Sequence, residues 1–148
     1  MSNEVIHMHF DVPGDDFTRA GEASGAVKKS LKQLGFDGDT IRKVAIAMYE
    51  GEINMVIHAG GGEVNIDISP QKVEITLSDK GPGIPDVEKA MQAGWSTAPD
   101  NVRSLGFGAG MGLPNIKKYS DDLKVTTAIG EGTTVYIAVK TQVTDDRL

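Results

Sequence analysis

Three polar side chains of one predicted helix lie at a spacing that suits metal chemistry. Glu50, Asn54 and His58 recur at every fourth position, so they share one face of a helix. A carboxylate and an amide one turn apart offer the oxygen ligands that Mg²⁺ prefers. A solvated polar face on an amphipathic helix would show the same pattern, so this feature alone does not decide between the two interpretations.

The sequence around Asp79 combines a carboxylate at the end of a strand with closely spaced glycines. Asp79 follows an apolar run and precedes Gly81 and Gly83 in the segment Asp-Lys-Gly-Pro-Gly. Such a carboxylate can accept a hydrogen bond from an amino group such as that of adenine, and the glycines let the backbone approach a flat ring. An ordinary strand-end turn is the alternative, because these residue types are also common in turns.

A glycine-rich run further along the chain indicates a phosphate-binding loop. Residues 106–112 read Gly-Phe-Gly-Ala-Gly-Met-Gly and lead into a predicted helix, whose free N-terminal amides attract phosphate. Arg103 precedes the run and can reach a terminal phosphate. The run lacks the Lys-Ser/Thr ending of a P-loop, and a flexible hinge is the alternative. Together with the Asp79 segment and the Glu50/Asn54 pair, it predicts a nucleotide–Mg²⁺ pocket.

The bulk composition limits the classes of function. The chain has 148 residues and a mass of 15.7 kDa, which predicts one domain with a sizeable core. A formal net charge of −6 and a pI near 5.0 argue against nucleic acid or an anionic membrane as the main partner. The absence of cysteine excludes disulfides and cysteine-ligated zinc. No signal peptide or long apolar run is evident, so we expect a cytoplasmic protein.

Periodicity and turn residues predict an α+β domain. The order β-α-α-β-β-lid-α-β-β predicts a two-layer sandwich, with a mostly antiparallel mixed sheet covered on one face by helices. Asp39 or Thr40 is expected to cap the second helix, and the three glycines from Gly60 are expected to end it. The predicted elements are strand 4–12, helix 15–35, helix 40–59, strands around 64–68 and 73–77, lid 84–111, helix 113–120, and strands 122–128 and 133–141.

In this order, the motifs resemble the ATP-binding domain shared by gyrase B subunits, heat-shock chaperone ATPases, sensor histidine kinases and mismatch-repair ATPases, the GHKL or Bergerat fold. Glu50-x-x-x-Asn54 resembles the N box of that family, and Asp79-x-Gly81-x-Gly83 its first glycine box. Residues 106–112 resemble the second glycine box. The segment Gly132-Thr133-Thr134 resembles the closing Gly-Thr motif.

Within this superfamily, the chain most resembles the stand-alone anti-sigma-factor serine/threonine kinases and their stress-signalling relatives. The resemblance lies in DKGPGIPD at 79–86 and GAGMGLPNIKK at 108–118. It implies a single ATP-binding kinase-like domain over 1–148, with an ATP lid at about 84–111, that phosphorylates a STAS-type anti-sigma-factor antagonist. A nucleotide-dependent binding switch and a detached histidine-kinase catalytic domain are the alternatives. A sigma factor as a second partner and a homodimer are also implied, since relatives of this type often dimerise.

The resemblance also implies a role for each candidate residue. Glu50 would be the general base for a serine or threonine hydroxyl, and Asn54 would bind Mg²⁺. By the same resemblance, Asp79 would bind the adenine amino group, Gly81 and Gly83 would surround the ring, and Thr133 or Thr134 would add a hydrogen bond nearby. The amides of Gly108, Gly110 and Gly112 would bind the phosphates. Arg103 would contact the γ-phosphate.

Two residues depart from the family pattern. Lys80 stands where asparagine is commoner, which places a cation near the nucleotide. Glu52 falls at the centre of the apolar side of its helix, where a carboxylate needs a partner or a cleft. It is open at this stage whether Glu52 is a second acid of the site or part of an interface, and the helical register favours Glu50 as the base.

Overall fold

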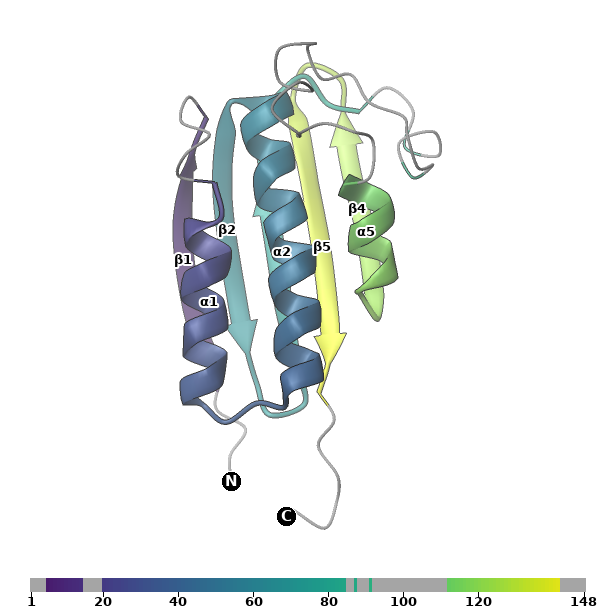
Figure 1. Ribbon diagram of the computed structural model, residues 1–148. Helices are drawn as coiled ribbons and strands as arrows, with labels where there is room; N and C mark the ends of the chain where they lie inside the picture. Colours follow the sequence, from purple (N-terminus) through teal and green to yellow (C-terminus); the bar gives the residue numbers. More distant parts are fainter. Residues whose placement is uncertain (1–4, 15–19, 85–86, 88–90, 92–111, 142–148) are drawn as a thin grey trace.

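The structure is a computed structural model of the chain, and it describes residues 5–14, 20–84, 87, 91 and 112–141. In these described residues, the helices α1, α2 and α5 lie over one face of a sheet, and no described helix lies on its other face (Figure 1). The elements are β1 Ile6–Pro13, α1 Glu22–Gln33, α2 Gly38–Ala59, β2 Gly61–Ile68, β3 Lys72–Ser78, α5 Gly112–Lys118, β4 Asp122–Ala128 and β5 Gly132–Lys140.

The five strands lie in the order β1-β2-β3-β5-β4. All four neighbouring pairs are antiparallel, so the described strands contain no parallel pair. The return of β5 between β3 and β4 places the start of the last strand beside the end of β3, where Ser78 faces Thr134. The predicted α+β two-layer sandwich is therefore confirmed, with a sheet that is antiparallel throughout its described part.

The core lies between the sheet and the helices. Period-two alternation turns the apolar side chains of β2 and β3 toward the helices, and all are at most 2% exposed: Val64, Ile66, Ile68, Val73, Ile75 and Leu77. Their polar neighbours in the same strands, such as Glu63 and Asn65, are exposed. The alternation predicted from the sequence is thus the alternation of the fold.

Helix α2 begins two residues before the position that we predicted. Its N-cap is Asp37, in an extended conformation, and the carboxylate of Asp37 accepts hydrogen bonds from the backbone N–H of Thr40 at 3.0 Å and from its hydroxyl at 2.6 Å. The prediction that Asp39 or Thr40 caps the helix is therefore wrong. The predicted end is confirmed, since Gly60 closes the helix in the left-handed conformation with φ 71°.

The N-terminus of α1 is capped by a side chain from another helix. The residue before this helix, Gly21, has φ 99° and no side chain to offer a cap. The Glu52 carboxylate instead accepts hydrogen bonds from the backbone N–H groups of Gly21 at 2.9 Å, Ala23 at 3.2 Å and Ser24 at 3.1 Å. The helix begins at Glu22 rather than near 15 as predicted, and residues 15–19 lie outside the described part of the chain.

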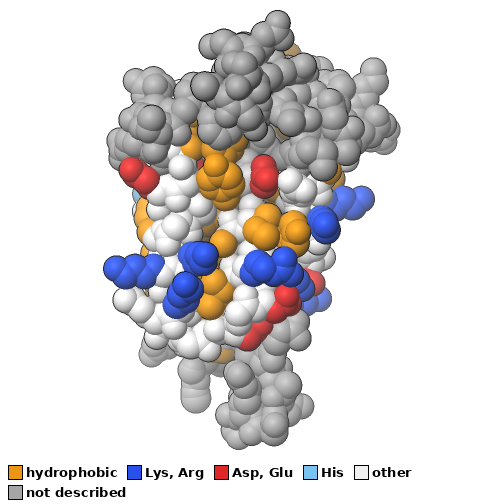
Figure 2. Space-filling model, viewed as in Figure 1, with side chains coloured by type: hydrophobic (Ala, Val, Ile, Leu, Met, Phe, Trp, Pro, Cys, Tyr) orange, Lys and Arg blue, Asp and Glu red, His pale blue; other side chains and the backbone are white. Residues whose placement is uncertain are grey.

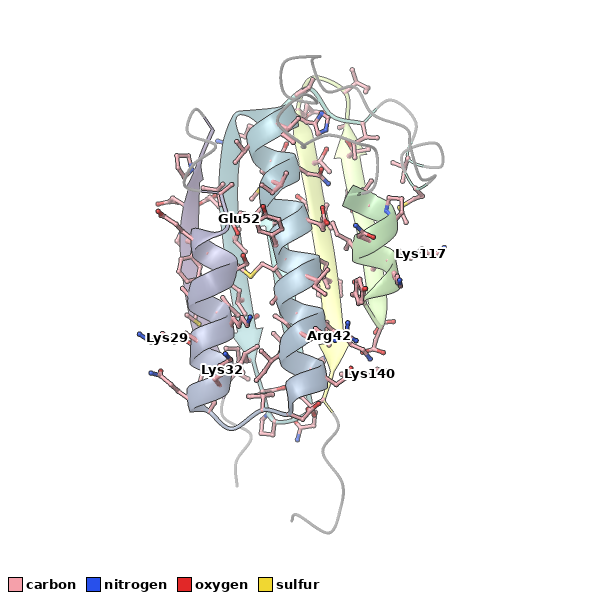
Figure 3. The ribbon with its side chains drawn as sticks, in the orientation of Figure 1. Lys29, Lys32, Arg42, Glu52, Lys117 and Lys140 are labelled. Atoms are coloured by element: carbon pink, nitrogen blue, oxygen red, sulfur yellow. The ribbon has the colours of Figure 1, made fainter. Side chains whose placement is uncertain are left out.

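This contact explains why Glu52 interrupts the apolar side of α2. Its side chain lies between α1 and α2 and is 1% exposed (Figure 3). A buried carboxylate is tolerated when hydrogen bonds stabilise its charge, and amides at a helix N-terminus also offer a favourable dipole. The structure thus supplies the partner that a carboxylate at this position needs: the oxygens of Glu52 hold α1 against α2, at the interface between the two helices.

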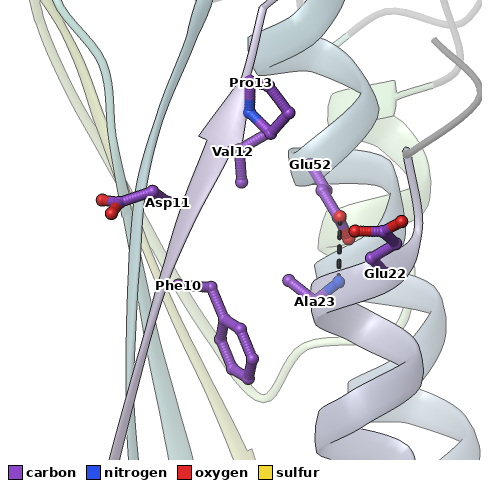
Figure 4. Close-up of a pocket in the computed structure, with 7 residues that line it drawn as sticks. All are labelled: Phe10, Asp11, Val12, Pro13, Glu22, Ala23 and Glu52. Carbon is purple, nitrogen blue, oxygen red and sulfur yellow. Dashed lines mark hydrogen bonds between the residues drawn. The ribbon is translucent and has the colours of Figure 1, made fainter. Parts of the chain in front are cut away.

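A small hollow of about 270 Å³ lies between β1 and the start of α1 (Figure 4). The residues that line it are Phe10, Asp11, Val12, Pro13, Glu22, Ala23 and Glu52. None of the predicted nucleotide-site residues belongs to this lining. Because the Glu52 carboxylate at its wall is already bonded to the amides of α1, we assign the hollow no part in the chemistry.

The charges on the helical face are unevenly distributed. Basic side chains gather over its lower half, away from the C-terminal end of α2 (Figure 2). Lys29 and Lys32 on α1 and Arg42 on α2 contribute to this group (Figure 3). Among the described residues, no helix has the length and apolar character needed to cross a membrane.

We expect Glu52→Ala to destabilise the fold by about 3 kcal/mol or more, because it leaves three amides without their charged acceptor. Urea unfolding followed by circular dichroism measures this change. Glu131→Ala, at an exposed turn position, is the control and should stay within about 0.5 kcal/mol of the parent protein. Equal losses in the two variants would contradict the capping role of Glu52.

Candidate nucleotide-binding site

The predicted site segments meet at one end of the molecule. The C-terminal end of α2, the end of β3 and the start of β5 all lie there, and α5 begins on the same side (Figure 1). Asp79 joins two of these segments: its Oδ1 accepts hydrogen bonds from the N–H groups of Gly81 at 2.9 Å and Thr133 at 3.1 Å. Its own N–H donates to the carbonyl of Thr133 at 2.9 Å. These bonds fix the carboxylate with Oδ1 engaged, and Oδ2 takes part in none of them.

The glycines of this turn allow backbones to approach closely. A Cβ atom on Gly81 would lie 2.6 Å from the Cβ of Ala59 at the end of α2. A Cβ on Gly132, which has φ 129°, would lie 2.1 Å from the carbonyl oxygen of Asp79. Gly83 also has a positive φ of 85°. A side chain at these positions would push the turn away from α2 and β5, so the glycines serve close packing here.

The two threonines of the closing motif differ in their surroundings. Thr133 is buried, and its hydroxyl lies 2.9 Å from the hydroxyl of Thr127, which in turn accepts a hydrogen bond from the N–H of Ile84 at 2.9 Å. Thr134 is half-buried, and its hydroxyl donates to Ser78 at 3.4 Å. Thr133 therefore ties the end of the glycine box to β4, which supports the shape of the turn.

Glu50 lies on the side of α2 that faces α5. Its carboxylate Oε2 accepts a hydrogen bond from the side-chain amide of Asn115 at 3.0 Å. Burial raises the pKa of Glu50 above its ordinary value, and the hydrogen bond from Asn115 partly opposes this effect. A half-buried carboxyl with a raised pKa is a common property of catalytic acids and bases.

Sequence reasoning missed Asn115. An asparagine early in a short helix has no pattern that marks it, and its partner is 65 positions away in the chain. Only the packing of α5 against α2 brings the two side chains together. The one signal available was the place of Asn115 in the sequence, directly before the apolar Ile116, which the fold buries.

The polar face predicted for α2 is only half-exposed. Asn54 and His58 follow Glu50 along the same face, and both are of intermediate exposure. Burial lowers the pKa of His58 below its ordinary value of 6.5, while the negative charge of Asp79 acts in the opposite direction. The charge of Asp79, in the first glycine box, therefore acts on the pKa of His58, on the polar face of α2.

Part of the predicted site cannot be placed. Arg103, Gly108 and Gly110, with most of the predicted lid 84–111, lie outside the described residues. Gly112 is described only as the first residue of α5. The structure therefore brings together the Glu50 face of α2, the Asp79 turn and the Thr133 motif, and leaves the lid residues as predictions.

Comparison with known families agrees with this geometry. The family described as "Histidine kinase-like ATPase domain" matches residues 15–139. The chain belongs to this family. The predicted resemblance to the ATP-binding domain of sensor histidine kinases is thereby confirmed, and the use of ATP follows from family membership.

Two relatives narrow the comparison within the family. The chain is 33% identical over 108 residues to the "Serine/threonine-protein kinase RsbT" of Bacillus subtilis, which covers 70% of this chain and 75% of that protein. It is 29% identical over 143 residues to the "Anti-sigma F factor" of Geobacillus stearothermophilus, which covers 93% and 92% of the two chains. One name is that of a serine/threonine-protein kinase and the other that of an anti-sigma factor, and the motifs resemble those of anti-sigma-factor serine/threonine kinases.

Solved structures share the fold. The structure of the RsbU and RsbW domains of a Mycobacterium tuberculosis protein matches with a TM-score of 0.63 at 16% identity, covering 92% of this chain and 32% of that longer one. A chain of the SiaB–SiaC complex from Pseudomonas aeruginosa matches with a TM-score of 0.61 at 12% identity, covering 93% and 90%. At such low identity, these matches establish the architecture alone.

We expect the pKa of His58 to fall further in Asp79→Asn, because the substitution removes the charge that raises it. The asparagine Oδ1 can still accept the two hydrogen bonds of the turn. An NMR titration of the imidazole measures the shift, with Asp122→Asn at the opposite end of β4 as the control. An unchanged His58 titration in Asp79→Asn would contradict the contact.

The sign of the coupling to stability follows from the lowered pKa. Below 6.5, the unfolded chain takes up a proton at His58 more readily than the folded chain does. The contribution of His58 to the free energy of unfolding is therefore present above pH 6.5, and it is lost as the pH falls through the pKa that His58 has in the folded protein.

Proposed function

We propose that this protein is an ATP-dependent protein serine/threonine kinase that acts as an anti-sigma regulatory factor. The observation that carries the proposal is the half-buried Glu50 carboxylate, which shares a face of α2 with Asn54 and accepts a hydrogen bond from the side-chain amide of Asn115 on α5. This face leads toward the Asp79 turn, so a proton acceptor and an adenine-type pocket belong to one site. The names of the two relatives support the same class of activity.

The described residues fit ATP. With Oδ1 of Asp79 bonded to two turn amides, Oδ2 is the atom that would accept the adenine amino hydrogen. Gly81 and Gly83, which lack side chains where the turn packs closely, would let the ring approach the backbone. Thr133 or Thr134 would add a hydrogen bond nearby, and Thr134 has the less buried side chain.

The reacting end of the site would be formed by α2 and the lid. Asn54 offers an amide oxygen to Mg²⁺, and Glu50 would accept the proton of the attacking hydroxyl. Gly108, Gly110 and Gly112 would hold the phosphates with their amides, and Arg103 would meet the γ-phosphate. When bound, Mg²⁺-ATP supplies the phosphoryl group and the charge neutralisation that such a transfer requires.

The partners that we propose follow from the relatives. The substrate would be a serine or threonine of a STAS-type anti-sigma-factor antagonist, and a sigma factor would be the second partner. Cytoplasmic location and a homodimer complete this proposal. The acidic net charge of −6 fits a regulator that acts on proteins rather than on nucleic acid directly.

A nucleotide-dependent binding switch with little phosphoryl transfer is the second candidate function. The Asp79 turn would serve a switch equally well, because it concerns the binding of the base only. Glu50 favours the kinase, since a module that only binds nucleotide needs no partly buried proton acceptor beside its metal ligand.

Asp79→Asn should weaken ATP binding by about tenfold to a hundredfold, because an amide N–H₂ would face the adenine amino group in place of a charged acceptor. Isothermal titration calorimetry with ATP measures the loss. The preference of the parent protein for ATP over GTP should also shrink in this variant. Unchanged ATP affinity in a folded Asp79→Asn protein would contradict the adenine contact, and Asp122→Asn serves as the control.

Glu50→Gln should retain ATP binding and lose phosphoryl transfer by about 10²- to 10⁴-fold, since glutamine cannot accept the hydroxyl proton. The assay combines radiolabelled ATP, Mg²⁺ and a purified antagonist-class protein, with EDTA as the control for metal dependence. Acid-stable phosphoserine or phosphothreonine is the expected product. Tight ATP binding without such a product would support the switch, and acid-labile phosphohistidine would indicate a histidine kinase.

A further inference from the structure

The contact between Asn115 and Glu50 joins two helices at the reacting end of the site. Asn115 lies one turn into α5, directly after the glycine-rich run that ends at Gly112. Its amide nitrogen Nδ2 donates to Oε2 of Glu50 at 3.0 Å in a partly buried setting. Within the described residues, this is the hydrogen bond that the structure gives to the Glu50 carboxylate.

We propose that Asn115 is a positioning residue for the general base: its amide holds Oε2 of Glu50, so that Oε1 accepts the proton of the substrate hydroxyl. This inference rests on the proposed kinase function. In the step itself, the proton passes to Oε1 as the hydroxyl oxygen bonds to the γ-phosphorus. The bond from that phosphorus to the β–γ bridging oxygen breaks, and ADP leaves with the electron pair.

The chemistry of an amide donor suits this task. Asn115 carries no charge, so it does not suppress the basicity of the carboxylate as a nearby lysine or arginine would. The amide nitrogen also cannot compete for the transferred proton, because its lone pair is delocalised into the carbonyl group and it is a very weak base. Burial raises the pKa of Glu50, and the hydrogen bond donated by Asn115 offsets part of that rise.

A purely structural role for Asn115 is less consistent with the packing of α5. Leu113 and Ile116 are 6% and 0% exposed, and these apolar side chains anchor the short helix to the core. Tyr119, just after the helix, has Arg42 at 5.5 Å from its ring centroid. Because α5 has these anchors, removal of the Asn115 amide should leave the fold in place.

The test compares Asn115→Leu, which removes the donor, with Asn115→Asp, which places a second carboxylate beside Glu50. Asn65→Leu, on the opposite face of the sheet, is the control. Carbon-detected NMR titration of the Glu50 carboxyl reports the contact without nucleotide or transfer. We expect the pKa of Glu50 to rise in both Asn115 variants, with the larger rise in Asn115→Asp because like charges repel.

Kinetics with ATP and the antagonist-class protein supply the second measurement. We expect kcat to fall by about tenfold or more in both Asn115 variants, the KM for ATP to stay unchanged, and the acidic limb of the pH–kcat profile to move to higher pH. Melting curves check that the variants are folded. If Asn115→Leu does not fold, Asn115→Asp alone provides the test.

The outcomes separate this inference from the proposed function. An unchanged Glu50 titration, or an unchanged kcat with a shifted titration, overturns the positioning role while the kinase proposal stands. A parent protein that binds ATP but forms no phosphoserine or phosphothreonine overturns the kinase proposal and, with it, the role of Asn115 in transfer. Loss of kcat with a raised Glu50 titration in the Asn115 variants, but not in Asn65→Leu, supports it.

Discussion

The close approach of helix α2 to the sheet at Gly51 is the constraint on which the rest of the site depends. A Cβ atom at this position would lie 2.7 Å from Cδ2 of the buried Leu77, so a larger residue would require the Leu77 side chain or the helix to shift. With Gly51 against the sheet, the adjacent side chains of Glu50 and Glu52 must leave the helix on opposite sides. One reaches α5 and the other reaches α1, so the register of this helix sets both contacts.

The Asp79 turn depends on the same helix. Gly81 packs against Ala59 in the last turn of α2, and Gly132 packs against the backbone of Asp79. A shift of α2 would therefore move the carboxylate that is bonded to Thr133. Close backbone packing, rather than a separate scaffold, couples the turn that we propose to bind adenine to the face that carries Glu50 and Asn54.

Much of the fold could be predicted from the sequence because the signals were local. The alternation from Val64 to Leu77 is a property of the strands themselves, and Gly60 marks the end of α2 by its conformation. The order of the N box, the glycine box and the Gly-Thr motif was enough to indicate the family, although each segment alone had an ordinary structural explanation. The cap of α2 was misplaced by two or three residues, because Asp37, Asp39 and Thr40 are all good caps on sequence alone.

The contacts that could not be predicted are those between distant segments. Glu52 was considered as a second acid of the site because the sequence shows only a carboxylate among apolar residues. Its partners are backbone amides at the start of a different helix, and residue types do not show which backbone amides will meet a side chain. Asn115 was missed for the related reason that its only described side-chain partner lies on another helix.

Glu50 and Glu52 show how the environment divides roles between identical side chains. Three backbone amides donate hydrogen bonds to the two oxygens of Glu52, so these oxygens are already engaged within the fold. Glu50 accepts a hydrogen bond from one neutral donor, Asn115, and burial raises the pKa of its carboxyl above the ordinary value. The same α-helix thus carries a structural carboxylate and the carboxylate that we propose as the proton acceptor, and the single residue between them keeps the two apart. If Glu50 is the base that we propose, its place on a helix packed against the sheet meets the requirement for accurate positioning that phosphoryl transfer places on a proton acceptor.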